Sequence, residues 1–225
     1  GSGLGCFEYC LIAEQLARGW MSVASLIARG NGTLMIDLLD KDQRRRILPR
    51  VASGDYLAAL SLSEPDTGSD LASISCRAVR DGDDWIINGS KTYITNAATA
   101  DWLCLLVVTD PDAGYGGYSQ ILVPTDTPGF RYELLDKIGN WGSDTGLLFF
   151  EDMRVPVAHT IGEIGRGFQQ QMMQFQDERL VACVSSMAGS EMLWEETRRW
   201  AEERVLFGKP LAKMQNTQFK MVELY

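Results

Sequence analysis

The stretch LSLSEPDTGSD, from Leu60 to Asp70, marks the point where the sequence changes character. It begins with the alternating pattern of a strand and ends in a turn rich in Pro, Gly and Ser. Two interpretations of the turn stay open. It is either an ordinary exit from a strand or a nest in which backbone N–H groups and hydroxyls near Pro65, Gly68 and Ser69 meet a ligand such as a pyrophosphate.

The patterns on either side of this stretch predict the order helices, sheet, helices. Upstream, apolar residues recur at helical spacing from Phe7 to about Leu48, with a short helix at Asp40–Leu48 that Pro49 ends. Downstream, short β-rich runs separated by Gly, Asp and Pro predict strands at 73–79, 85–88, 91–95, 102–108, 119–123 and 147–150. Helical spacing then returns and predicts two helices, at 168–188 and 191–206.

Composition limits the classes of function. The 225 residues carry a formal net charge of -9, which disfavours nucleic acid as a partner. His159 is the only histidine and the five cysteines form no CxxC pair, so no metal site is predicted. No apolar run approaches the ~18 residues that span a bilayer, so we expect a soluble, intracellular protein without a membrane partner.

Three further segments have both a structural and a functional interpretation. In KTYITN, Lys91–Asn96, the side chain of Tyr93 belongs to the core or stacks on a planar ring. In QDERL, Gln176–Leu180, the carboxylate of Glu178 is solvated or, if the helix is covered, becomes a general base with a raised pKa. In RVLFGKPL, Arg204 ends a helix and belongs to a helix hairpin or holds a phosphate.

Six blocks of the chain resemble, in the same order, successive blocks of the acyl-CoA dehydrogenase family, and together they extend over most of its length. They are LSLSEPDTGSD (60–70), KTYITN (91–96), GNWGSDTGLLFFEDMRVP (139–156), GRGF (165–168), DERL (177–180) and RVLFGKPLAKMQ (204–215).

The resemblance implies an α+β fold with an N-terminal helical domain, a middle β-barrel-like domain and a C-terminal helical bundle. On this chain the three domains would occupy residues 1–55, 56–163 and 164–225. The opening GSGLG and the final helical run without a stop signal predict that the first and last domains are partial.

The resemblance also implies FAD as the cofactor and an acyl-CoA as the substrate. The positions that match the family's FAD contacts are Leu60, Leu62, Ser63, Gly68, Ser69, Tyr93, Ile94, Thr95, Arg204, Phe207 and Gln215. The last three match residues that reach the FAD of a neighbouring subunit, so a homodimer or homotetramer is implied. The positions that would bind the substrate are Ser69, Phe175 and Arg179.

Glu178 matches the catalytic glutamate of the isovaleryl and long-chain branches, whereas most of the family carries it on a late loop that lies beyond this chain. The family has Trp where this chain has Tyr93 and Thr where it has Ser63, which preserves stacking and hydroxyl chemistry. Glu178 would remove the α-proton of the thioester while the flavin accepts the β-hydride, giving a trans-2-enoyl-CoA.

Electron transfer flavoprotein is the implied electron acceptor, and the bacterial cytoplasm or the mitochondrial matrix the implied location. Two alternatives stay open at this point. One is a flavin oxidase of the same fold, similar to acyl-CoA oxidases or nitroalkane oxidases, although the latter use Asp as base. The other is a non-catalytic remnant that binds CoA or oligomerises.

Overall fold

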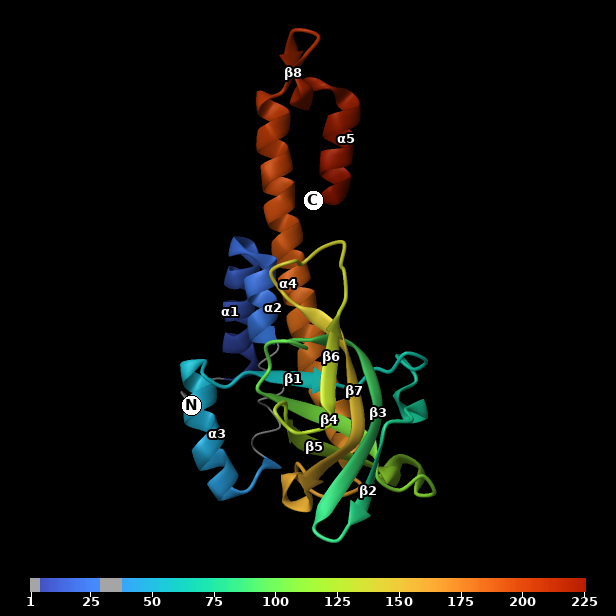
Figure 1. Ribbon diagram of the computed structural model, residues 1–225. Coiled ribbons are helices and arrows are strands. Elements are labelled where there is room, and N and C mark those ends of the chain that lie inside the picture. Colours follow the sequence, from blue (N-terminus) through green and yellow to red (C-terminus); the bar gives the residue numbers. More distant parts are fainter. Residues whose placement is uncertain (1–4, 29–37) are drawn as a thin grey trace.

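The computed structural model describes residues 5–28 and 38–225. Its parts lie along one long axis (Figure 1). A curled sheet and the N-terminal helices occupy one end, and an arm of two antiparallel helices extends from them, with the C-terminus on the returning helix. None of the described helices is long and apolar enough to cross a membrane.

Three helices precede the sheet: α1 (Cys6–Gly19), α2 (Met21–Ala28) and α3 (Lys41–Ser53). The predicted helical pattern is confirmed where it is described, but it is not continuous, because Trp20 has an extended backbone that ends α1. The part of the pattern at 29–37 lies outside the described residues. Figure 1 shows α1 and α2 beside the long C-terminal helix and α3 apart from them.

The prediction that Pro49 ends a helix is wrong. Asp40 caps α3 by accepting hydrogen bonds from the amides of Asp42 and Gln43, and the helix runs past Pro49 to Ser53. Ile47 and Val51 pack from α3 against a buried apolar cluster of the sheet, and this burial offsets the cost of a proline within a helix.

The middle of the chain forms a seven-stranded sheet in the order β1-β4-β2-β3-β7-β6, with β5 paired to β4. The strands are β1 (Ala58–Ser61), β2 (Arg77–Asp81), β3 (Asp84–Thr95), β4 (Trp102–Val108), β5 (Tyr118–Pro124), β6 (Phe130–Leu134) and β7 (Thr145–Pro156). Just past β1, the amide of Thr92 on β3 donates to the carbonyl of Ser63 at 2.8 Å. The end of β1 therefore meets β3 as well as β4, and the sheet curls.

Two strand predictions are corrected by hydrogen bonding. The predicted strand 73–79 is a short 3-10 turn at Leu71–Ser73 followed by β2, because the amides of Ser75 and Cys76 bond to a side chain, that of Glu64, and not to a strand. The two strands expected at 85–88 and 91–95 are one, β3, whose middle stays paired with β7. The strand at 102–108 is confirmed, and so is the strand that opens LSLSEPDTGSD, which is β1 and begins at Ala58, whereas β6 was not predicted.

Apolar side chains fill both faces of the sheet. The main cluster lies inside the curl and includes Trp85, Ile87, Leu105, Phe150 and Met153. A second cluster lies between β1, β4, β5 and α3, and a third between the loop after β1 and the start of the C-terminal helix. The loop that follows β1 is therefore held on its inner side by packed apolar residues.

The two C-terminal helices predicted at 168–188 and 191–206 are a single helix, α4 (Gly167–Glu203). It stays helical through Gly189 because this stretch is buried against α1 and α2, where Ala17, Ala24 and Ala188 pack together. A Cβ at Gly167 would lie 2.6 Å from the carbonyl carbon of Ser119, so only glycine lets the helix begin this close to β5.

A tight hairpin joins α4 to the last helix, α5 (Gln215–Leu224). Its strands are β8 (Val205–Leu206) and β9 (Lys209–Pro210), and the two residues between them, Phe207 and Gly208, have φ angles of 51° and 75°. Positive φ at both central positions is the geometry of a type I′ turn. The simple helix hairpin considered from the sequence thus contains a small β-hairpin at its tip, far from the sheet in Figure 1.

Candidate functional site

The loop after β1 presents small polar residues on a packed base. The backbone groups of Glu64 and Thr67 bond to each other in both directions, at 2.8 and 3.1 Å, which closes a tight turn. Leu62 before the turn is buried, whereas Gly68 and Ser69 after it are exposed. Nothing lies within 4 Å of where a Cβ of Gly68 would be. The turn therefore leaves an open surface beside exposed backbone and a hydroxyl.

Tyr93 lies on a β-bulge that turns its ring out of the sheet. The pairing of β3 with β7 shifts register between Lys91 and Ile94, and Tyr93 between them has a φ of 56°. A non-glycine residue in this region costs on the order of 1 kcal/mol, and such strain concentrates at functional sites. Its ring is 74% exposed while Ile94 is buried. Tyr93 is thus not the core residue of the structural interpretation.

A buried ion pair connects the loop to the bulge. The ammonium of Lys91 donates to Glu64 Oε1 at 3.0 Å and to the carbonyl of Leu62 at 2.8 Å. Burial alone would raise the pKa of Glu64, but Lys91 and the amides of Ser75 and Cys76 hold it below its usual value. Burial lowers the pKa of Lys91, which Cys76 and Glu64 only partly counteract.

Glu178 lies half-buried on α4, where the helix meets α1 and the sheet. Gln174, one turn earlier and buried, donates to Glu178 Oε1 at 3.4 Å. Burial and then the nearby Glu178 carboxylate raise the pKa of Tyr9 on α1 to about 12, and the same two causes raise the pKa of Cys104 on β4 to about 12. Glu178 is therefore half-buried near residues of two other elements and is not the carboxylate of a freely solvated helix face.

Phe175 brings this turn of α4 to the loop. Its ring packs on the third apolar cluster, which contains Leu62 and borders Leu60. The guanidinium of Arg179 lies 5.2 Å from the centre of the Phe175 ring and is exposed. The loop is thus connected to α4 through Phe175 and to the bulge at Tyr93 through Lys91.

The arm carries the remaining predicted residues away from this region. Arg204 ends α4, Phe207 is 89% exposed in the hairpin turn, and Gln215 is the exposed first residue of α5. The structure links the loop to the bulge with Ile94 and Thr95 through Lys91 and Thr92, and to the Glu178 turn through Phe175. Figure 1 shows the hairpin of Arg204 and Phe207 at the end of the molecule opposite the sheet.

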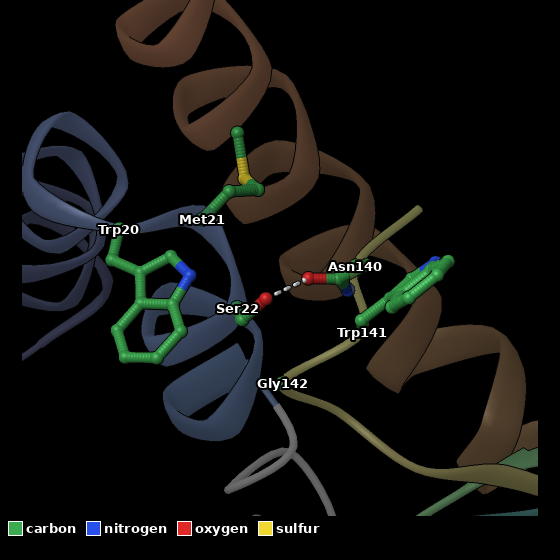
Figure 2. Close-up of a pocket in the computed structure, with 6 residues that line it drawn as sticks. All are labelled: Trp20, Met21, Ser22, Asn140, Trp141 and Gly142. Carbon is green, nitrogen blue, oxygen red and sulfur yellow. Dashed lines mark hydrogen bonds between the residues drawn. The ribbon is translucent and has the colours of Figure 1, made fainter. Parts of the chain in front are cut away.

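Sequence reasoning gave no role to a hollow at the start of α2. It has a volume of about 540 Å³ and is lined by Trp20, Met21, Ser22, Asn140, Trp141 and Gly142 (Figure 2). Ser22 Oγ donates to Asn140 Oδ1 at 2.7 Å, which joins the loop to the helix, and Lys137 Nζ donates to the carbonyl of Asn140 at 3.1 Å within the loop. Figure 2 shows the Trp20 and Trp141 rings on opposite sides of the hydrogen bond between Ser22 and Asn140.

Sequence reasoning also missed Glu64, Lys91 and Gln174, the residues that support the predicted positions. Glu64 and Lys91 stand inside two of the matching blocks, and for Lys91 a charged residue at a predicted strand position was the available signal. Gln174 shares the helical stripe of Glu178, four residues away. Among the residues that the structure describes, no group of three His, Cys, Asp or Glu is placed to hold a metal.

Family models match nearly the whole chain. The acyl-CoA dehydrogenase N-terminal, middle and C-terminal domains match residues 1–55, 59–153 and 165–225. The long-chain specific acyl-CoA dehydrogenase of Sus scrofa is 37% identical over 82% of this chain and 44% of its own length. The human short-chain specific enzyme is 33% identical over 100% of this chain and 55% of its own.

A solved structure agrees with these matches. The acyl-CoA dehydrogenase from Geobacillus kaustophilus superimposes with a TM-score of 0.93 at 34% identity, over 100% of this chain and 60% of that one. The chain belongs to the acyl-CoA dehydrogenase family. Its predicted fold is confirmed, with helices before and after a middle curled sheet in chain order. The chain spans 44% to 60% of the length of these three relatives. The domain limits after residues 55 and 163 stay predictions.

Proposed function

We propose that the chain is the FAD-binding part of an acyl-CoA dehydrogenase that oxidises an acyl-CoA thioester between its α and β carbons. Family membership supports the reaction class. The observation that carries the proposal is the exposed ring of Tyr93, held on a strained bulge that Thr92 connects by a hydrogen bond to Ser63, in the loop of Gly68 and Ser69. A ligand that stacks on this ring would account for the strained backbone of Tyr93.

The residues present fit a flavin. An exposed aromatic ring offers a stacking surface for the isoalloxazine system, and Thr95 follows it on the same strand. The loop adds the hydroxyls of Ser63 and Ser69 and the exposed backbone of Gly68 for the polar edge and the pyrophosphate. When bound, FAD supplies the hydride-accepting chemistry that no side chain provides.

Glu178 is the base in this proposal. Its carboxylate takes the α-proton of the thioester, a step that demands a base removed from bulk water. The half-buried position of Glu178, close to Tyr9 of α1 and Cys104 of β4, supports this role. The resemblance of DERL to the long-chain and isovaleryl branches also implies this role, since those branches carry their glutamate at the matching helix position.

Other residues bind and orient. Arg179 and Phe175 lie on the same two turns of α4 as Glu178 and would hold the CoA thioester together with Ser69. Arg204, Phe207 and Gln215 lie on the distant arm and would reach the FAD of a second copy, in a homodimer or homotetramer. Electron transfer flavoprotein is the proposed acceptor.

An anaerobic visible spectrum tests the proposal. The purified chain is mixed with FAD and titrated with short, long and branched acyl-CoAs. Loss of the flavin absorption with one class of acyl-CoA is the expected result and identifies the substrate class. A chain that binds no FAD, or a bound flavin that no acyl-CoA reduces, contradicts the proposal. Formation of peroxide in air with the same acyl-CoA would assign the chain to the oxidases of this fold.

A further inference from the structure

Within the proposed function, we infer that the buried pair Glu64–Lys91 is a positioning device for the flavin. It fixes the loop at Gly68 and Ser69 relative to the ring of Tyr93. Neither charged residue is placed to touch the flavin itself, because both side chains are buried, Lys91 at 0% and Glu64 at 6% exposed. Their effect would be exerted through the two backbone segments that they join.

The contacts of the pair reach three separate segments. Glu64 accepts hydrogen bonds from the amide and the hydroxyl of Ser75, at 2.7 and 2.8 Å, and from the amide of Cys76 at 2.9 Å. Lys91 donates to Glu64 and also to the carbonyl of Leu62. The two ends of the turn, before Glu64 and after Asp70, are thus bound to each other and to β3.

The pair holds the bulge at its first residue. Lys91 is the last paired residue of β3 before the register shift, and the amide of Thr92 bonds to the carbonyl of Ser63. Tyr93 comes next, with its left-handed backbone. Because the ammonium is fixed two residues before Tyr93, small movements of the loop and of the ring are coupled.

A purely stabilising role explains this arrangement poorly. A buried ion pair has a desolvation cost that often equals its attraction, and apolar residues of similar size stabilise a core as well. The ion pair of Arg154 with Asp84, at the other end of β3, is exposed at 3.2 Å and shows that the strand does not need buried charge along its length. The buried charges lie where the loop and the bulge must keep a fixed geometry.

The test compares FAD affinity with fold stability in the variant Glu64→Gln/Lys91→Met, which removes both charges at nearly constant volume. We expect this variant to unfold cooperatively near the wild-type midpoint and to bind FAD at least about tenfold more weakly, measured by quenching of flavin fluorescence. The matched control is Arg154→Met, which breaks the exposed pair of the same strand and should leave FAD affinity unchanged.

The outcomes separate the two claims. A folded double variant with wild-type FAD affinity overturns the positioning role and leaves the proposed function intact. A wild-type chain that binds no FAD overturns the proposed function and the positioning role together. If the double variant does not fold, Glu64→Gln alone is measured by hydrogen exchange. Faster exchange at the amides of 62–70 and 92–96 supports the inference, and unchanged exchange there overturns it.

Discussion

The sheet end and the helical arm differ in how they use apolar surface. In the sheet, large side chains such as Trp102 and Phe150 are buried, and the charged pair Glu64–Lys91 is enclosed and hydrogen-bonded. On the arm, large apolar side chains are exposed, among them Trp200, Phe207, Phe219, Val222 and Tyr225. In the proposed function, the part of the site on the sheet would be completed within one chain, whereas the arm would present residues to a second copy.

The largest expected effect concerns Glu178, at the junction of α4 and the sheet. Glu178→Gln keeps the shape but removes the base, so reduction of bound flavin by acyl-CoA should slow on the order of 10³-fold with FAD affinity retained. Glu195→Gln is the control, because Glu195 is exposed on the same helix and pairs with Arg198. Stopped-flow reduction measures both variants, and equal rates for the two would remove Glu178 from the reaction.

Because side chains are buried in the sheet and exposed on the arm, truncating them should lower the free energy of unfolding more in the sheet than on the arm. Phe150→Ala empties a position inside the curled sheet and should lower the free energy of unfolding by about 3–5 kcal/mol. Phe219→Ala truncates a ring that is 63% exposed on α5 and should change it by less than about 0.5 kcal/mol in the isolated chain. Urea unfolding measures both. A large loss for Phe219→Ala would mean that the arm is packed as tightly as the sheet.

If the arm serves a second copy, Phe207 matters for association and not for folding. Phe207→Ala should weaken self-association about tenfold, measured by sedimentation, with the unfolding midpoint unchanged. Val79→Ala provides the control, since Val79 is an exposed apolar residue on β2, away from the arm. Unaltered association of the Phe207 variant would contradict a role of the hairpin between subunits.

The smallest expected effect is a pH dependence of the pair at the loop. The pKa of Glu64 is lowered from 4.5, so its contribution to stability is present above that value and is lost as the pH falls through the folded-state pKa. Wild type should exceed Glu64→Gln in unfolding free energy by on the order of 1 kcal/mol at neutral pH, and the difference should shrink in acid. Denaturant titrations at both pH values measure it, and a constant difference would contradict an ionised Glu64.

Local patterns predicted the fold class and the β4 strand well, and failed where distant contacts decide the structure. Pro49 and Gly189 are helix breakers in sequence, yet both stay helical because α3 packs on the sheet and α4 packs on α1 and α2. Side-chain bonds from Glu64 delay the start of β2, which no propensity indicates.

In the candidate site, too, the sequence indicates which residues matter but not the distant contacts that place them. Resemblance pointed to Tyr93, Glu178 and the loop residues, and contacts of Lys91, Thr92 and Phe175 link the three segments that carry them. The bulge that exposes Tyr93 and the ion pair that precedes it depend on pairing with β7 and on a contact 27 residues away along the chain. Such long-range pairing is not visible in a local pattern.

Hydrogen exchange of the chain with and without FAD tests the central claim most directly, namely that the loop and the bulge form the flavin site. We expect FAD to slow exchange at the amides of 62–70 and 92–96, and at those of 204–215 only where a second copy is bound. Protection confined to other segments, such as the hollow beside Trp20 and Trp141, or no protection at all, would contradict the account.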